Sequence, residues 1–398
     1  MVLATSLTTH SCHPTWVGGF GLGSRSGLEA RFVVTTTTGL EDVTASEVEK
    51  LGCRVREVLM GRVVCSGKEK HVYILNLCVK SAERVYLLLV EGEIESLRDV
   101  YKLVVGVEPW FIGKKQPFAV RTTRHGSHSF TSLDVSAAVG QGVVDAYFER
   151  FGERPVVSLD YPSVELKAWV VDNHFMLGLN TTGETLSKRR LRPYLHPAPI
   201  KPSLAASLLF LSGYSGEFLL DPFCGSGTIL IEAAQIFRRI HNGCFRRDFS
   251  FVSLPFFDVG TYRKVLYSCT KKIVSESTKL VGLDLFQKHV VGARLNARAA
   301  FVGDTIHFLR GDATKLCVSP PELVVTNPPY GVRIGSKKKV GETYKGFCRE
   351  IKEFKGLKVV FITAFAGVED CFQELKLLER REIMYGSLRS FVYSYLVD

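Results

Sequence analysis

The sequence predicts an α+β N-terminal half followed by an α/β C-terminal half that is built on a mostly parallel sheet. From residue 204 onward, segments with helical and with strand periodicity alternate strictly, which is typical of parallel strands covered by helices on both faces. Before residue 184 the expected elements come in a mixed order instead, with some strands adjacent in sequence. The 398 residues are enough for two or three domains of about 100 to 200 residues each.

The composition indicates a folded protein with a basic surface. Hydrophobic residues make up 46% and charged residues 23%, which excludes a disordered chain. The 51 Lys and Arg outnumber the 40 Asp and Glu, giving a net charge of +11 and a pI near 9.1. This charge favours a polyanionic partner such as nucleic acid, with a solvated basic surface as the alternative. No apolar run approaches the roughly 18 residues that a membrane helix needs, so we expect no membrane partner.

The cysteines and the N-terminal segment point to no metal site and no signal peptide. The 10 cysteines are scattered without a C-x-x-C pair, which is typical of buried thiols in a reducing, cytoplasmic compartment. His10, Cys12 and His13 lie close together, but three potential ligands near a terminus are weak evidence for zinc. Residues 1–30 are rich in Ser, Thr and Gly and lack the basic start of a signal peptide. We expect this extension to be poorly ordered.

Residues 31–92 are expected to form a small α+β domain. Apolar spacing and polar residues in the first turns predict its helices, while β-branched content and a turn at Gly61 predict its strands. The predicted strands are 32–36, 55–59, 62–65 and 84–90, and the predicted helices are 40–51 and 68–77. Their order, β-α-β-β-α-β, is that of a ferredoxin-like domain.

Residues 93–183 form a second predicted α+β region. It contains a short helix, a strand at 118–122, a long helix at 132–151 and two strands at 164–171 and 174–180. The basic segment between the first strand and the long helix is predicted to be a loop rich in hydroxyl groups. Its Arg121, Arg124 and His125 are suited to the phosphate oxygens of RNA, with a solvated loop as the alternative.

A basic connector at 184–202 joins the two halves. Three prolines after His196 predict a stiff, extended chain. The connector is basic enough to track a nucleic-acid backbone, and a plain linker is the alternative. The residues proposed to contact RNA are Lys188, Arg189, Arg190 and Arg192.

Predicted helices and strands alternate strictly in the C-terminal half, residues 203–398. Helices are predicted at 204–211, 229–240, 290–301, 343–354 and 368–377, and strands at 218–220, 280–283, 306–309, 323–325 and 359–362. Two more strands at 382–385 and 390–396 form a hairpin, which adds one antiparallel strand to the sheet. The connection before the strand at 280–283 is about 40 residues, longer than a minimal sheet needs. We interpret it as an insertion that presents Arg238, Arg239, Arg246 and Arg247 to RNA.

The first strand of this half runs into a glycine turn at Asp221–Thr228, which contains Gly225 and Gly227. An aspartate also follows each of the next two strands. The glycines let a ligand approach the backbone and leave helix N-terminal amides free. No Lys follows the second glycine, which argues against a P-loop, and Leu230 replaces the third glycine of a dinucleotide fingerprint. Asp221 suits an amine-bearing cation, Asp284 suits ribose hydroxyls and Asp312 suits an adenine amine. Each aspartate alone could instead be a helix N-cap.

The fourth strand, at 323–325, runs into Asn327-Pro328-Pro329-Tyr330. Two consecutive prolines end both sheet pairing and helix entry. The chain therefore turns rigidly at the carboxyl end of the strand, where open α/β sheets bind ligands. The turn offers the Asn327 amide oxygen to an exocyclic amine and the Tyr330 ring to a flat base. Alternatively, Asn327 only bonds the backbone of its own turn.

The three aspartates and the N-P-P-Y turn at successive strand ends resemble class I S-adenosylmethionine-dependent methyltransferases of the branch that modifies base amino groups. The opening Phe118-Ala-Val-Arg121 and the element order of 93–183 resemble a THUMP domain, an RNA-binding module of tRNA-modifying enzymes. The whole chain resembles THUMP-containing guanine-N2 methyltransferases of tRNA, and less closely those of large-subunit ribosomal RNA. Two stretches are most similar to archaeal enzymes that modify guanosine 6 of the acceptor stem, namely Phe286-Gln-Lys288-His289 and Gly331-x-x-Ile334-Gly335.

The resemblance implies a seven-stranded, Rossmann-like α/β methyltransferase domain preceded by an α+β ferredoxin-like plus THUMP region. It implies S-adenosylmethionine as cofactor at the first three strand ends, and the target amine at the fourth. The implied cofactor contacts are Asp221, Pro222, Cys224, Gly225, Gly227, Thr228, Asp284, Leu285, Asp312, Ala313 and Asn327, and the implied catalytic residues are Asn327, Pro328 and Tyr330.

The expected partner is tRNA, and the chain is expected to be a monomer. Four alternatives stay open at this point: a ribosomal RNA guanine, an adenine N6 amine, a protein glutamine amide, or a non-catalytic RNA-binding protein that retains the fold.

Overall fold

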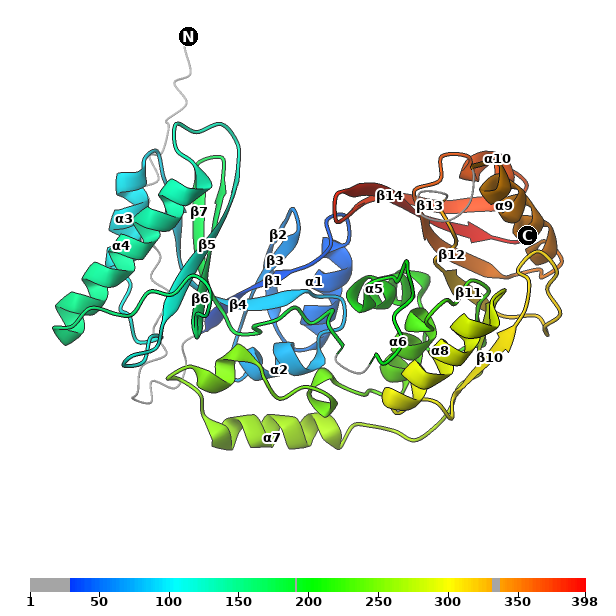
Figure 1. The fold of residues 1–398 in the computed structure, drawn as a ribbon, viewed down its shortest axis with the longest axis horizontal. Coiled ribbons are helices and arrows are strands. Elements are labelled where there is room, and N and C mark those ends of the chain that lie inside the picture. The colour runs from blue at the N-terminus through cyan, green and yellow to red at the C-terminus, as the bar shows by residue number, and fades with distance from the viewer. Residues whose placement is uncertain (1–28, 190–191, 331–336) are drawn as a thin grey trace, which may run out of the picture.

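A computed structural model describes residues 29–189, 192–330 and 337–398 of the chain. Within these ranges, each half of the protein contains one seven-stranded sheet, and the two sheets lie side by side (Figure 1). In the described ranges, no helix combines the length and the apolar character that a membrane crossing requires.

The N-terminal sheet has the strand order β2-β3-β1-β4-β7-β6-β5. Its elements are β1 (Ala30–Thr35), α1 (Glu41–Lys50), β2 (Arg54–Leu59), β3 (Arg62–Gly67), α2 (His71–Cys78), β4 (Arg84–Glu93), α3 (Leu97–Val105), β5 (Phe118–His125), α4 (Ser132–Phe151), β6 (Val164–Val171) and β7 (His174–Asn180). Strand β4 pairs with β1 on one side and with β7 on the other. The ferredoxin-like segment and the segment after it therefore share one continuous sheet.

The C-terminal sheet has the strand order β10-β9-β8-β11-β12-β14-β13. Its elements are α5 (Pro202–Ser212), β8 (Leu219–Asp221), α6 (Thr228–Phe237), β9 (Leu280–Asp284), α8 (Gln287–Ala299), β10 (Ile306–Arg310), β11 (Leu323–Thr326), α9 (Lys337–Ile351), β12 (Lys358–Thr363), α10 (Val368–Cys371), β13 (Lys376–Tyr385) and β14 (Leu388–Leu396). Strand β14 is antiparallel to both of its neighbours, whereas β8 to β12 pair in parallel. The prediction of one antiparallel strand is confirmed.

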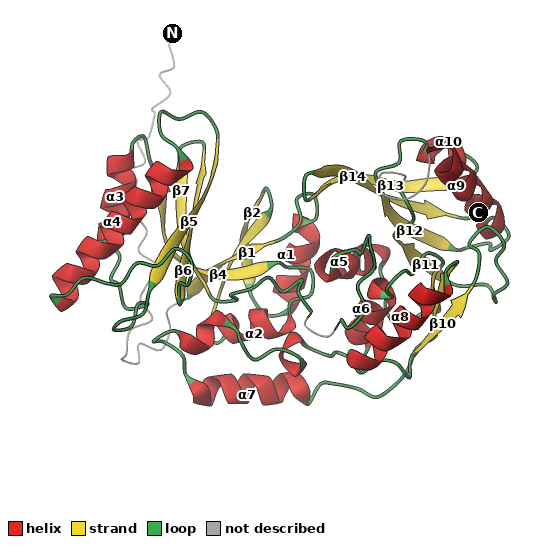
Figure 2. Ribbon diagram, in the orientation of Figure 1, coloured by secondary structure: helices red, strands yellow, loops and turns green. Residues whose placement is uncertain are grey.

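Alternate side chains of the central strands enter separate cores, as expected for a sheet covered on both faces. Leu323 and Val325 of β11 join the core formed with α5, α6 and α8. Val324 joins the core formed with α9 and α10. Figure 2 shows the two groups of helices on either side of the sheet.

The helix predicted at 368–377 is wrong in its second half. Helix α10 ends at Cys371, and β13 begins at Lys376. Leu377, the last residue of the predicted helix, and Leu378 after it are 45% and 46% exposed. They are exposed because β13 is the edge strand of the sheet.

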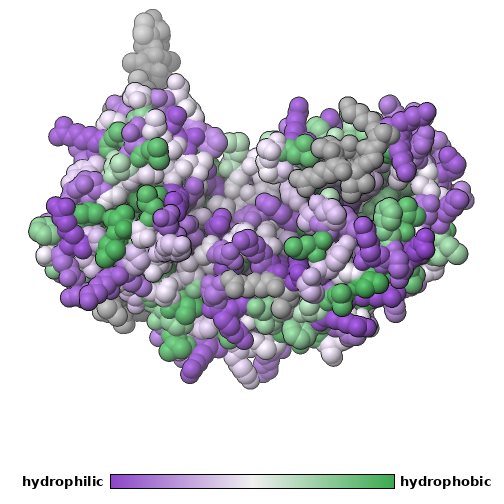
Figure 3. Space-filling model, in the orientation of Figure 1, coloured by the Kyte–Doolittle hydropathy of each residue, from purple (hydrophilic) through white to green (hydrophobic). Residues whose placement is uncertain are grey.

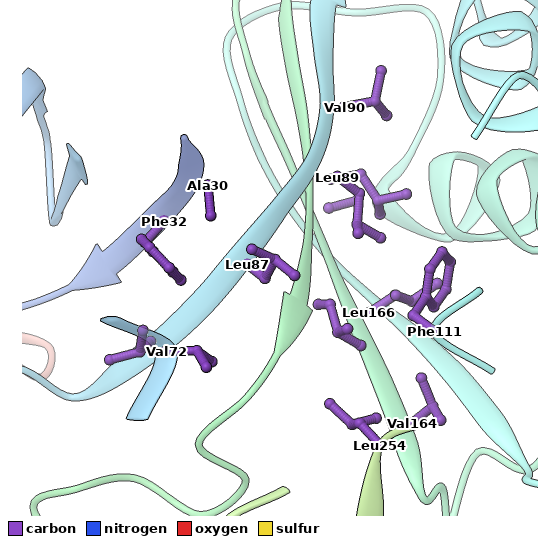
Figure 4. Packing of buried hydrophobic residues seen from close by; sticks show 14 of the residues in the cluster. Ala30, Phe32, Val72, Leu87, Leu89, Val90, Phe111, Val164, Leu166 and Leu254 are labelled. Carbon is purple, nitrogen blue, oxygen red and sulfur yellow. The ribbon is translucent and has the colours of Figure 1, made fainter. Parts of the chain in front are cut away.

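The insertion between α6 and β9 packs against the N-terminal half. It contains two short 3-10 helices (Asn242–Cys244 and Ser250–Ser253) and α7 (Val259–Thr270). Leu254 belongs to the same apolar cluster as Val164 of β6 (Figure 4), and the Phe251 ring lies 5.1 Å from the Tyr73 ring of α2. The insertion, which belongs to the C-terminal half, therefore makes buried contacts that hold the two halves against each other.

Two arginines of the insertion are buried in contacts within the protein, so the prediction that they face RNA is wrong. Arg246 donates to the carbonyl oxygens of Thr182 and Glu184, each at 2.7 Å, and is buried. Arg238 is also buried and forms an ion pair with Asp304. Arg239 and Arg247 are exposed.

Candidate active site

Four polar side chains stand at the carboxyl ends of four adjacent strands. Asp221 and Asp284 end β8 and β9, Asp312 lies two positions after β10, and Asn327 directly follows β11. Because the strand order is β10-β9-β8-β11, they line one edge in the order Asp312, Asp284, Asp221, Asn327. The order of the strands along the sheet reverses direction between β8 and β11. Open α/β sheets bind their ligands at the carboxyl ends of the strands at such a reversal.

The glycine turn between β8 and α6 is held against the end of β9. The Cys224 amide donates to the Leu283 carbonyl at 2.9 Å, and the Gly225 amide donates to Asp284 Oδ2 at 3.2 Å. Gly225 and Gly227 have φ of 52° and 77°, in the left-handed region that favours glycine. A Cβ on Gly227 would lie 2.7 Å from the Phe308 ring. Both positions therefore require glycine for their backbone conformation, and Gly227 also packs too closely on the Phe308 ring of the core to carry a side chain.

Asp221 lies beneath the turn and is only 1% exposed. It accepts hydrogen bonds from the Thr326 hydroxyl at 2.6 Å and from the Phe223 amide at 3.2 Å. Burial raises the pKa of Asp221 to about 7, the two hydrogen bonds oppose this shift, and the charge of Asp284 adds to it. A cationic ligand beside this carboxyl would favour its ionised form.

The other two carboxylates are partly occupied by their own turns. Asp284 accepts from the amides of Gly225 and Phe286, the latter at 2.8 Å. Asp312 Oδ1 accepts from the Thr314 amide at 2.9 Å and its hydroxyl at 2.7 Å, and these bonds lower the pKa of Asp312. Among the described residues, Asp312 Oδ2 has no donor. Asp312 can therefore accept hydrogen bonds from its own turn and from a ligand at the same time.

The turn after β11 is closed by its own side chains. The Tyr330 hydroxyl donates a hydrogen bond to Asn327 Oδ1, and both residues are half-buried. Burial raises the pKa of the Tyr330 phenol well above its usual range, so the hydroxyl keeps its proton. A base amine can use the Asn327 oxygen only if this bond is shared or broken. Gly331, Ile334 and Gly335 lie outside the described residues.

The connector brings two rings to the glycine turn that sequence reasoning missed. The Tyr194 hydroxyl lies 2.5 Å from His289 Nδ1, and the His196 and His289 rings are 4.3 Å apart. The His196 ring also lies 3.5 Å from the position of a Cβ on Gly225. A glycine inside a predicted helix, Gly292, was the signal in the sequence that another group packs closely there. In the structure, a Cβ on Gly292 would lie 2.2 Å from the Tyr194 ring.

The predicted loop at 121–128 is in large part strand, because β5 continues to His125. Arg121 and His125 are exposed, and Arg121 donates to the Leu159 carbonyl. Arg124 is half-buried and is bonded to His128 Nδ1 at 2.7 Å and to the Gly126 carbonyl at 3.1 Å. A strand presents side chains alternately, which leaves Arg121 and His125 on the same face.

Two connector arginines point inward, so the prediction that they contact RNA is wrong. Arg189 makes two hydrogen bonds to the Glu232 carboxylate, at 3.0 and 3.1 Å, with side chains 10% and 2% exposed. Arg192 donates to the Thr228 hydroxyl at the start of α6, and burial lowers the pKa of Arg192. Lys188 is exposed and pairs with Glu184 at 2.8 Å. Arg190 lies outside the described residues, as do His10, Cys12 and His13.

Three family profiles match successive parts of the chain. An RlmL ferredoxin-like domain matches residues 31–86, a THUMP domain matches residues 95–180, and an RMKL-like methyltransferase domain matches residues 189–390.

Two curated relatives and one solved structure are similar over most of their length. The tRNA (guanine(6)-N2)-methyltransferase of Archaeoglobus fulgidus is 36% identical over 411 residues, covering 100% of this chain and 98% of the relative. The enzyme of the same name from Methanocaldococcus jannaschii is 36% identical over 379 residues, covering 91% and 98%. A crystal structure of a possible methylase from Clostridium difficile 630 is 28% identical with a TM-score of 0.85, covering 92% of this chain and 98% of that one.

Proposed function

The chain belongs to the family of THUMP-domain methyltransferases that includes the archaeal tRNA (guanine(6)-N2)-methyltransferases, and we propose that it methylates the N2 amine of guanosine 6 in tRNA. One observation assigns this function to specific residues. Asp312, Asp284, Asp221 and Asn327 lie in a row at the carboxyl ends of four adjacent strands. The first three suit a nucleoside with an attached amino acid, and the fourth suits the acceptor amine.

The residues present fit S-adenosylmethionine as the methyl donor. The glycine turn adopts left-handed φ at Gly225 and Gly227, and at these positions no side chain would stand between its backbone and the ligand. The buried Asp221 carboxyl would attract the ammonium group of the methionine part, with Pro222, Cys224 and Thr228 around it. Asp284 with Leu285 would hold the ribose, and Asp312 with Ala313 the adenine amine. When bound, the sulfonium supplies an already electrophilic methyl group.

The turn after β11 would hold and orient the acceptor. The Asn327 side-chain oxygen and the Pro328 carbonyl accept hydrogen bonds from the guanine N2 amine, which directs its lone pair toward the methyl group. Orientation of this kind lowers a barrier by up to roughly 7 to 11 kcal/mol in well-aligned cases. The Tyr330 ring stacks on the base, a contact worth about 1 to 3 kcal/mol on other base platforms.

The RNA would be held mainly by the N-terminal half. Arg121 and His125 are exposed on β5, and Lys188 is exposed on the connector between the halves. Figure 3 shows that the surface is hollowed between the two halves on the face drawn. We propose that tRNA spans this hollow, and that the target base leaves its stack to reach Asn327.

The test is methylation of tRNA followed by nuclease digestion and mass spectrometry. The protein is incubated with labelled S-adenosylmethionine and either unmodified tRNA or ribosomal RNA. We expect N2-methylguanosine at position 6 of tRNA. N6-methyladenosine, or label in ribosomal RNA only, would reassign the substrate. Failure to bind S-adenosylmethionine in a calorimetric titration would instead indicate a non-catalytic RNA-binding protein.

A further inference from the structure

A cavity of about 570 Å³ lies where the two halves and the insertion meet. Its walls come from α1 and α2 of the N-terminal half, from α5 and the end of α6, and from α7. The candidate active site lies at the opposite end of α6, a helix of 10 residues that spans about 15 Å at 1.5 Å per residue. None of the four polar residues at the strand ends lines this cavity. The cavity is therefore a separate site.

The interior of the cavity is largely apolar. Leu51 and Ile74 from the N-terminal half face Phe210, Ile236 and Ile240 from the C-terminal half. The thiols of Cys78 and Cys269 also line it. Binding sites for small molecules typically have volumes of roughly 300 to 1,000 Å³ and mostly apolar walls with a few polar groups. The cavity has the size and the lining of such a site.

The rim of the cavity is strongly basic. The exposed cations around it are Lys50, Lys70, Arg239, Lys264 and Lys272. In the part of the chain that the structure describes, none of these side chains forms a salt bridge. Glu47 is the acidic residue of the lining, and its carboxylate is occupied by the amides of Lys80 and Ser81, at 2.7 and 2.9 Å. Positive charge at the rim is therefore not neutralised by salt bridges, although Lys264 is close enough to Asp258 to help lower the pKa of that carboxyl.

One further cation stands inside the cavity. Lys80 is 5% exposed, and its ammonium donates to Gln235 Oε1 of α6 at 3.1 Å. Glu232 and Glu47 offset part of the charge of this ammonium, and the remainder adds to the attraction for an anionic group. Because Lys80 belongs to the N-terminal half and Gln235 to α6, the bond also crosses the boundary between the halves.

We propose that this cavity binds a small organic anion, with an apolar body against the inner walls and a phosphate or carboxylate group at the basic rim. An RNA backbone fits less well, because a hydrated phosphodiester chain gains little from apolar walls and thiols. A ligand in this cavity contacts both halves and the insertion. Its binding therefore stabilises the arrangement of the halves.

The test uses anilinonaphthalene sulfonate, a fluorescent probe with an aromatic body and an anionic group. Ser268→Trp fills the cavity from α7, and Lys264→Glu with Lys272→Glu reverses the charge of the rim. Lys271→Glu is the matched control, because Lys271 lies beside Lys272 but does not line the cavity. Circular dichroism and thermal melting establish that each variant is folded.

We expect saturable binding to the wild-type protein, a loss of affinity of about tenfold or more in both cavity variants, and little change in Lys271→Glu. Octanoate should displace the probe better than inorganic phosphate does, because it also fills the apolar interior. Equal affinity in all folded variants, or an equal loss in the control, overturns the proposal. It is also overturned if tRNA displaces the probe and binds more weakly to the double variant, because the cavity then belongs to the RNA surface.

Discussion

Thr326 donates a 2.6 Å hydrogen bond to the buried carboxylate of Asp221. Thr326 is the last residue of β11 and directly precedes Asn327, whereas Asp221 ends β8 and begins the glycine turn. The bond therefore joins the proposed cofactor site to the proposed acceptor site. Both partners are buried, so the bond is shielded from water. A hydrogen bond is stronger in such surroundings than in water.

Thr326→Val retains the shape of the side chain but removes this bond. Asp221 then loses a donor, its pKa rises further, and a protonated carboxyl no longer attracts the ammonium of S-adenosylmethionine. We expect the Kd of the cofactor at neutral pH to rise about three- to tenfold, measured by calorimetry. Thr326→Ser keeps the hydroxyl and is the control. Equal affinity in the two variants would show that the bond is irrelevant to binding.

The titration of Asp221 should appear in the pH dependence of stability. Burial raises the pKa of Asp221 from 3.8 to about 7, so the folded state holds this proton more tightly than the unfolded chain does. The free energy of unfolding contributed by this group is therefore highest below about pH 4 and falls as pH rises toward about 7, by up to about 1.4 kcal/mol per pH unit.

Asp221→Asn cannot titrate and should lack this fall. Relative to the wild type, we expect the variant to become more stable as pH rises from about 5 to about 8, in urea unfolding without cofactor. Its affinity for S-adenosylmethionine should nevertheless decrease, because the carboxylate is missing. A stability difference that stays constant with pH would contradict the raised pKa.

Asn327→Ala tests the proposed acceptor site directly. The substitution removes the amide oxygen that would orient the guanine amine, and it leaves the glycine turn untouched. We expect little change in the binding of S-adenosylmethionine, because its other implied contacts remain, and a single-turnover rate lower by about a hundredfold or more. Single-turnover rates near those of the wild type would overturn the assignment of Asn327.

Tyr330→Phe separates the hydroxyl of Tyr330 from its ring. The hydroxyl occupies Asn327 Oδ1 in the structure, so its removal frees this acceptor while the aromatic platform stays. We expect a single-turnover rate equal to or above that of the wild type. Tyr330→Ala removes the platform and should be slower by about tenfold or more, in line with stacking energies of about 1 to 3 kcal/mol. A Phe variant as slow as the Ala variant would assign the hydroxyl a direct role.

The candidate site could be predicted from the sequence because its determinants are local. Strand, turn and helix follow each other at 219–237, and a double proline after Asn327 fixes where β11 must end. Parallel pairing then brings the strand ends to one edge without further information. The bond between Tyr330 and Asn327 was not predicted, since the same residues also fit an open turn.

The fate of the basic segments could not be predicted, because it depends on partners far along the chain. Arg189 and Lys188 are neighbours of like charge, yet Arg189 is neutralised by Glu232, 43 positions away, while Lys188 stays at the surface. The burial of the insertion could not be predicted for the same reason. Its Phe251 is buried against Tyr73 of α2, a residue far away in the sequence.

Arg189→Ala should destabilise the protein rather than weaken RNA binding alone. It removes the hydrogen-bonded cation of the buried Glu232 carboxylate and leaves Lys80 and Arg192 as the cations near it. Breaking a buried ion pair in this way typically costs about 3 to 5 kcal/mol. Lys188→Ala is the neighbouring control and breaks a surface pair worth about 0 to 1 kcal/mol. Both are measured by denaturant unfolding. Equal stability of the two variants would show that Arg189 is not buried in solution.

The thiols of Cys78 in α2 and Cys269 in α7 lie 3.2 Å apart and should form a disulfide under mild oxidation. The hydrogen bond from Cys78 lowers the pKa of Cys269, which increases the share of Cys269 that is the reactive thiolate at neutral pH. With oxidised glutathione, the two protein thiols are oxidised to a disulfide while the glutathione disulfide is reduced to two thiols.

We expect peptide mapping without reductant to find the segments of Cys78 and Cys269 linked, and the thermal midpoint to rise, because the bond ties the insertion to the N-terminal half. Cys78→Ser provides the control, in which Cys269 should carry glutathione as a mixed disulfide instead. The exposed Cys317 has no thiol neighbour among the described residues and should also remain a mixed disulfide. Recovery of mixed disulfides on both Cys78 and Cys269 in the wild type would mean that α2 and α7 do not hold these thiols together in solution.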